Sequence, residues 1–144
     1  MRRKNCLASM KKTIVVVAAI VCVLSVGIEV LAASKTFSKA FVDSNQWTSI
    51  VSARKDSTSG FCSVTVDDIY DADGNTCNYK KVKVVCYNTT NVAVNNSSYT
   101  ATKGKMCIMG YKSGFNVVGR TMTLKAMGNN PSLDCKISGA FNPD

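Results

Sequence analysis

Histidine is absent from this chain of 144 residues, and glutamate occurs once, at Glu29. Without histidine, neither a Ser-His-Asp nor a Cys-His catalytic arrangement can be built. Beyond residue 33, acid–base catalysis would fall on aspartate alone. No CxxC pair occurs, which excludes the usual zinc sites. We therefore expect a protein that is not an enzyme, with no catalytic residues, no cofactor and no bound metal.

Proline is also scarce, with two residues, and no helical periodicity is sustained after residue 33. Apolar and polar residues instead alternate in short runs that Gly, Asn and Asp interrupt. The clearest runs are 62–66, 82–86 and 122–126, and weaker ones are Phe37–Val42, Trp47–Arg54, Val92–Thr100, Lys105–Tyr111 and Cys135–Phe141. About eight short strands at this spacing predict an all-β fold, an antiparallel β-sandwich.

The N-terminus, by contrast, has the features of an export signal. Basic residues precede an apolar run, Ile14–Ile28, and small residues at 30–33 suit a signal peptidase. The run is shorter than the roughly 20 residues that span a bilayer. We expect residues 1–33 to form a signal helix that is cleaved, and residues 34–144 to be a secreted β domain. The alternative is a single-pass membrane anchor at residues 14–33.

Positive charge is in excess after the signal. Thirteen of the 18 lysines and arginines lie there with eight aspartates, which leaves a net charge of about +5. The densest cluster, Lys80, Lys81 and Lys83, surrounds Val82 and precedes Val84, which predicts a solvated strand face rather than a nucleic-acid site. A cationic secreted domain concentrates at anionic surfaces, so the candidate partners are the cell wall or a membrane surface, and no nucleic acid.

The turn at Asp73-Gly74-Asn75 predicts a hairpin between the runs 62–66 and 82–86. If paired residue numbers sum to 148, the valines of both runs share one buried face and Cys62 lies opposite Cys86. The neighbouring acidic residues also suggest calcium, but their spacing departs from an EF-hand and a solvated hairpin tip accounts for them. These candidates are Asp67, Asp68, Asp71, Asp73 and Asn75.

Five cysteines remain after the signal, and export makes them candidates for disulfides. The predicted register and an up-and-down strand path place Cys62 and Cys86 at one end of the domain. They place Cys77, Cys107 and Cys135 at the other end, where three thiols share one bond. The alternative for Cys62 and Cys86 is that they are free thiols that pack in the core.

Three C-terminal segments have a familiar pattern: Lys105–Tyr111, Gly119–Ala126, and Ile137–Asp144 with its closing Ser-Gly-x-aromatic-x-Pro-Asp. They resemble a loose group of small secreted proteins of Gram-positive bacteria, mostly uncharacterised, some of which are grouped with bacteriocins. Phe141 and Asn142 stand where that group has Trp and Ser. The resemblance implies a secreted β-sandwich and supplies no catalytic residues.

Three functions are compatible with these features. The favoured one is a secreted, non-enzymatic β module that acts at the cell surface or in the medium, by binding or as a bacteriocin-like effector. A structural surface or matrix component is the second, and it requires self-association through an exposed edge strand. The third is an aspartate-based secreted hydrolase, which requires two aspartates to meet in a pocket. The candidates are Asp43, Asp56, Asp67, Asp68, Asp71, Asp73 and Asp134.

Overall fold

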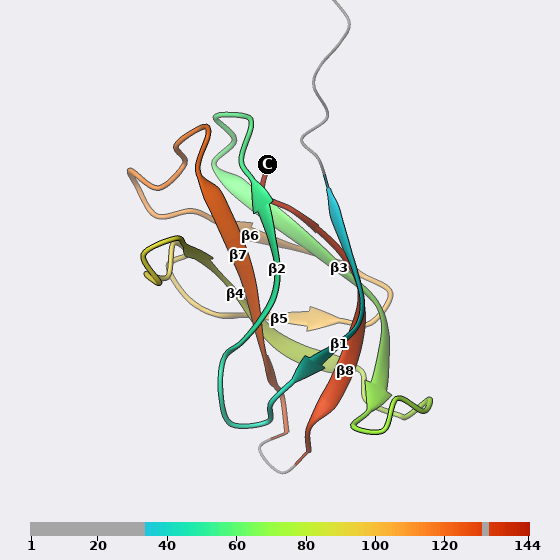
Figure 1. The fold of residues 1–144 in the computed structure, drawn as a ribbon. Helices are drawn as coiled ribbons and strands as arrows, with labels where there is room; N and C mark the ends of the chain where they lie inside the picture. The colour runs from blue at the N-terminus through green and yellow to red at the C-terminus, as the bar shows by residue number, and fades with distance from the viewer. Residues whose placement is uncertain (1–33, 131–132) are drawn as a thin grey trace, which may run out of the picture. The chain divides into compact units, whose positions relative to one another are not determined.

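The computed structural model describes residues 34–130 and 133–144, so the predicted signal segment 1–33 lies outside the described residues. Eight strands form two antiparallel sheets of four strands, ordered β1-β8-β3-β6 and β2-β7-β4-β5 (Figure 1). The prediction of an all-β fold with about eight strands is confirmed. The strands are β1 Lys35–Val42, β2 Thr48–Arg54, β3 Phe61–Asp71, β4 Lys81–Asn88, β5 Tyr99–Thr102, β6 Met106–Gly110, β7 Thr121–Gly128 and β8 Cys135–Asn142. Within the described part of the chain, no helix is long and apolar enough to cross a membrane.

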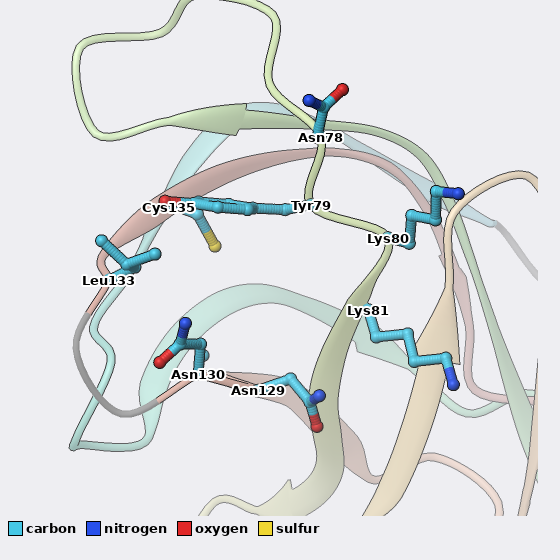
Figure 2. Close-up of a pocket in the computed structure, with 9 residues that line it drawn as sticks. Asn78, Tyr79, Lys80, Lys81, Asn129, Asn130, Leu133 and Cys135 are labelled. Carbon is cyan, nitrogen blue, oxygen red and sulfur yellow. The ribbon is translucent and has the colours of Figure 1, made fainter.

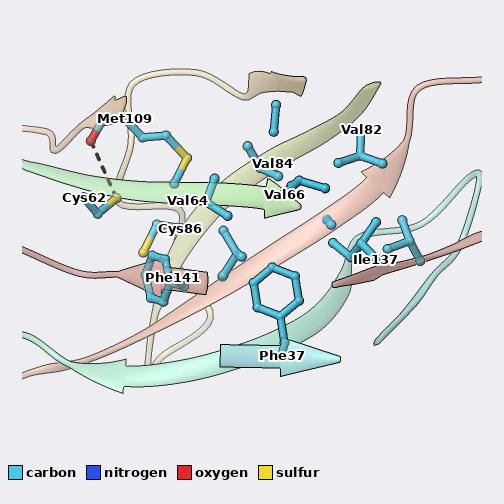
Figure 3. Packing of buried hydrophobic residues seen from close by; sticks show 14 of the residues in the cluster. Phe37, Cys62, Val64, Val66, Val82, Val84, Cys86, Met109, Ile137 and Phe141 are labelled. Atoms are coloured by element: carbon cyan, nitrogen blue, oxygen red, sulfur yellow. Dashed lines mark hydrogen bonds between the residues drawn. The ribbon is translucent and has the colours of Figure 1, made fainter. Parts of the chain in front are cut away.

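The core lies between the two sheets, where every second residue of β7 and β8 is buried. A single apolar cluster draws on both sheets, and Val64, Val84 and Phe141 within it have no exposed surface (Figure 3). Burying each large apolar side chain contributes about 1.5–3 kcal/mol, so this cluster is the main source of stability. On β4 the lysines Lys81 and Lys83 alternate with buried valines, as the sequence predicts for a solvated face.

The predicted pairing of residues 62–66 with 82–86 is wrong, because β3 and β4 belong to different sheets. β3 pairs with β6 and β8, whereas β4 pairs with β5 and β7. The turn itself forms: Gly74 has a φ of 95°, and Asp71 Oδ1 accepts the amides of Gly74 and Asn75, each at 2.8 Å. It starts a connection that carries the chain to the other sheet. Two buried valine faces fit side by side or across a core, and alternation does not distinguish these arrangements.

The strand predicted over 92–100 is also displaced, since β5 begins only at Tyr99. A loop precedes it, in which Asn88 Oδ1 accepts the amides of Thr90 at 3.1 Å and Val92 at 2.9 Å. Asn95 is then buried with its side chain hydrogen-bonded inside the sandwich. A side chain that satisfies main-chain groups in this way replaces the strand pairing expected from alternation.

Candidate functional site

A cavity of about 270 Å³ opens where the connection from β3 to β4 meets the segment between β7 and β8. Figure 2 shows the Tyr79 ring edge-on along one side of this space, Asn129 and Asn130 on the opposite side, and Leu133 at one end. Its lining consists of Asn78, Tyr79, Lys80, Lys81, Gly128, Asn129, Asn130, Leu133 and Cys135. We call this site the Tyr79 cavity. Segments about 50 residues apart in the sequence build it together.

The wall formed by the end of β7 is held in place by the turn between β1 and β2. The Gly128 amide donates to the Asp43 carbonyl at 2.9 Å, and the Ser44 amide donates to Asp134 Oδ1 at 2.8 Å. A Cβ atom on Gly128 would lie 3.0 Å from Ser44 Cα, so glycine allows the turn to approach this closely. Hydrogen bonds to the turn between β1 and β2 therefore hold the asparagine side of the cavity in place.

Tyr79 and Cys135 are both neutral at pH 7. Burial raises the pKa of Tyr79, and the neighbouring Cys77, Cys135 and Asp71 raise it further. Burial also raises the pKa of the Cys135 thiol to about 11, with smaller contributions from Cys77 and Asp134. The phenol therefore keeps a proton to donate, and the thiol is a poor nucleophile because the thiolate is the reactive form.

The cavity offers several groups that can bind a polar ligand, and neither a carboxylate nor an imidazole is among them. Asn129 and Asn130 lie opposite the ring and carry amides with both donors and acceptors, whereas the Asn78 amide points away on the other side of Tyr79 (Figure 2). The Tyr79 ring supplies an apolar face with a polar end. The side chains of Lys80 and Lys81 extend away from the space between ring and amides, so they act at the rim (Figure 2). The lining contains no acidic residue. This chemistry suits a small hydroxyl-rich ligand such as a sugar, whose ring stacks on tyrosine while its hydroxyls bind amides.

Most of the aspartates predicted for a hydrolase or a calcium site have separate partners. Asp43 and Asp71 accept amide protons within their own turns. Asp68 forms an ion pair with Lys103 at 2.8 Å, and Asp56 forms one with Arg54 at 3.3 Å. In residues 34–130 and 133–144, no group of three or more acidic, cysteine or histidine side chains is placed to hold a metal ion.

All five cysteines in the described part of the chain have free thiols, so the predicted disulfides are not present as bonds. Cys62, Cys86 and Cys135 are buried, and Cys77 and Cys107 are half-buried. Cys62 on β3 and Cys86 on β4 nevertheless lie next to each other, across the interface between the sheets (Figure 3). They are close because the two sheets pack together, and the predicted hairpin register does not account for it.

Two features of the structure were not predicted from the sequence. The first is the Tyr79 cavity, whose residues come from two irregular segments that show no periodicity. The second is a fully buried Lys55, whose Nζ lies 3.2 Å from the Pro143 carbonyl, 3.3 Å from Asp144 Oδ1 and 4.8 Å from the centre of the Tyr111 ring. The burial of Lys55 could have been predicted. It lies two residues after Ala53 of β2, whose side chain is buried, and alternate residues of an extended chain face the same side.

The chain matches no protein-family model, no curated protein and no solved structure. Its function therefore has to be argued from the geometry described above.

Proposed function

We propose that residues 34–144 form a secreted, non-enzymatic β module that binds a ligand of the cell surface through the Tyr79 cavity. The observation that carries this proposal is the lining of the cavity, in which an aromatic ring lies opposite Asn129 and Asn130 and no carboxylate is present (Figure 2). Such a lining binds polar ligands, and it contains neither a carboxylate nor an imidazole. The sequence features of export and the bacteriocin-like resemblance agree with action outside the cell.

The charge of the module favours an anionic surface as the place where it acts. Lys80 and Lys81 stand exposed at the rim of the cavity. A net positive domain concentrates at walls and membranes that carry negative charge, and this attraction weakens with salt. In an oxidising compartment the cysteines would form disulfides, which would stabilise a small domain exposed to the medium.

Replacing Tyr79 with alanine should weaken binding to purified Gram-positive cell walls at least tenfold, because the stacking face is lost. Tyr79→Phe keeps the ring and should retain most of the affinity. Co-sedimentation of the purified domain with insoluble walls measures both variants. Adding soluble N-acetylglucosamine oligomers should compete if the ligand is a wall glycan.

The matched control is Tyr87→Ala, because Tyr87 is also half-buried but does not line the cavity. Thermal melting shows whether each variant is folded. If folded Tyr79→Ala binds walls as well as the control does, the cavity is not the binding site.

A structural surface component is the second candidate, and the open edge of β6 favours it. β6 ends its sheet, and exposed Met106, Ile108 and Phe61 flank this edge with 65%, 60% and 58% of their surface accessible. The Gly110 amide donates to Tyr99 Oη at 3.1 Å, on the side away from β3. In a strand, the N–H and C=O groups of every second residue point to the same edge. Those of Ile108 therefore point to the same open edge as those of Gly110, and a second copy could pair with this edge.

This candidate predicts a concentration-dependent increase in mass that Ile108→Lys abolishes, because a charge on an edge strand opposes pairing. Sedimentation velocity over a hundredfold range of concentration measures it. Val117→Lys, a change at an exposed loop residue, is the control. A wild-type domain that stays monomeric throughout would contradict assembly through β6.

A further inference from the structure

Cys62 and Cys86 meet in the centre of the sandwich, although they come from different sheets. Cys62 is 1% exposed on β3 and Cys86 is 0% exposed on β4. Figure 3 shows them next to each other, with Met109 on one side and Phe141 on the other. Met109 occupies the position opposite Cys62 on β6, and Leu124 occupies the position opposite Cys86 on β7. The side chains of the two cysteines therefore face the core and each other. Neither cysteine is the other's partner in the strand pairing.

Buried Asn95 contacts both cysteines of this pair. Its Oδ1 accepts the Cys86 amide at 2.6 Å, and its Nδ2 lies 3.8 Å from Cys62 Sγ. The same Nδ2 donates to the Gly110 carbonyl at 2.9 Å. A single amide group, whose two polar atoms lie only about 2.3 Å apart, thus contacts both cysteines. Asn95 therefore links β3, β4 and β6 at the place where the two cysteines face each other.

The two thiols differ in their affinity for a proton. A hydrogen bond from the Cys86 thiol lowers the pKa of Cys62 against the opposing effect of burial, and Tyr111, Asn95 and Lys55 lower it further. The same hydrogen bond raises the pKa of Cys86, as does burial. Each thiol therefore alters the protonation of the other, as expected for two side chains that lie close together in the folded protein.

A second pair of thiols lies beside the Tyr79 cavity. Cys77 Sγ is 3.5 Å from the Ile69 carbonyl on β3, and Cys135 pairs with Asp71 two residues further along the same strand. Both side chains therefore lie along the 69–71 stretch of β3, and Cys77 adds to the effect of burial in raising the pKa of Cys135. Cys107 has a different environment, since it lies opposite Val64 on β6. After burial, Cys62 is the one thiol that raises the pKa of Cys107.

We propose that the exported protein carries two disulfides, Cys62–Cys86 across the sheets and Cys77–Cys135 beside the cavity, and that Cys107 is the unpaired thiol. For each bond, one thiolate attacks a sulfur of an oxidant disulfide and forms a mixed disulfide. The partner thiol then loses its proton, attacks the mixed disulfide and releases the reduced oxidant. Two thiols thereby lose two protons and two electrons, and the oxidant disulfide becomes two thiols.

The oxidant belongs to the class of protein or small-molecule disulfides, such as glutathione disulfide. Because Cys62 and Cys86 are closed off from solvent, their bond has to form during folding, before the sheets have packed. The folded reduced protein should accordingly resist oxidation at this pair.

Peptide mapping of the exported protein, alkylated without reduction, tests this assignment. Trypsin leaves Cys62 and Cys77 in one peptide, so cleavage before aspartate has to be added to separate 56–66 from 73–80. We expect 56–66 linked to 84–103, 73–80 linked to 134–136, and 106–112 recovered with one alkyl group. The intact mass should be about 4 Da below that of the reduced chain, because two disulfides remove four hydrogens.

Linkage of 56–66 to any other peptide would overturn the bond across the sheets, and linkage of 106–112 to any peptide would overturn Cys107 as the unpaired thiol. Alkylation of all five cysteines would overturn both. As a second measurement, a reductant should lower the melting temperature of the refolded wild type by at least about 5 °C. Cys62→Ser should make that shift smaller, because only the Cys77–Cys135 bond is then left to reduce. Cys107→Ser is the control that should keep the full shift. None of these readouts depends on ligand binding.

Discussion

Replacing Asp144 with alanine is expected to destabilise the domain by about 3–5 kcal/mol, because it leaves the buried Lys55 ammonium without its charged partner. The Lys55 side chain has no exposed surface, and that of Asp144 is 8% exposed. Asp144 Oδ1 also accepts the Ser57 amide at 2.8 Å and the Ser57 hydroxyl at 2.9 Å, and both would lose this acceptor. Urea unfolding followed by Trp47 fluorescence measures the loss.

Lys55→Met provides the comparison. Methionine fills a similar apolar volume and removes the buried charge together with its need for a partner, so it should cost less than Asp144→Ala. In the double variant, Asp144→Ala should become much less harmful than it is alone. A loss below about 1 kcal/mol in the single Asp144→Ala variant would show that Lys55 finds water or another acceptor there.

Acidification should reveal the same ion pair. Burial acts to raise the pKa of Asp144, but hydrogen bonds from Asp56, Ser57 and Lys55 outweigh it and lower the pKa. A carboxyl group with a lowered pKa in the folded state stabilises the fold above its unfolded pKa of about 3.9. That contribution is lost as the pH falls through the folded pKa. Asp144→Asn should therefore show a weaker decrease of stability on acidification below about pH 4 than the wild type.

The strands could be predicted because their residues alternate with a period of two. β7 and β8 show every second residue buried, and the predicted runs 122–126 and 135–141 overlap them closely. The inward faces of β3 and β4 were also correctly identified, with Val64 and Val84 fully buried. The alternation predicts which side chains of a strand are buried. It carries no information on which strand lies alongside, because burial is the same for every neighbour.

The pairing of strands could not be predicted for the same reason. Gly74 and Asn75 do form a turn, but turn chemistry does not state whether the next strand returns beside the first or crosses to another sheet. The Tyr79 cavity depends on where two irregular segments meet, so it follows only once the sheet order is known. The Asn95 side chain accepts the Cys86 amide in place of a main-chain carbonyl, and the pattern of apolar residues does not predict such a contact.

The closing segment 137–144 has a structural role for each of its distinctive residues. Ser138 Oγ accepts the Lys39 amide at 2.9 Å, and Phe141 is fully buried. The Pro143 carbonyl accepts the Tyr111 hydroxyl at 2.7 Å, and Asp144 binds Lys55. A Ser-Gly-x-aromatic-x-Pro-Asp ending is thus explained by packing and hydrogen bonds inside this sandwich, and it needs no catalytic role.

Gly139 is the residue of that ending for which we expect the largest effect of a single added methyl group. It lies on β8 opposite Val66 on β3 and Phe37 on β1, and the register shifts at this point on both neighbours. A Cβ atom there would fall inside the van der Waals radius of the Thr65 carbonyl and 3.0 Å from the Phe37 ring. Gly139→Ala should therefore destabilise the domain by about 3 kcal/mol, as measured by urea unfolding.

Gly60→Ala is the matched control, because a Cβ at Gly60 would meet nothing within 4 Å and its φ is not positive. Alanine there restricts the unfolded chain and should leave stability unchanged or slightly higher. The contrast matters because the obstacle at Gly139 is main chain, which cannot move aside without breaking the pairing of β3 with β8. Equal stability of the two variants would mean that β3 and β8 are further apart at this point than the structure shows.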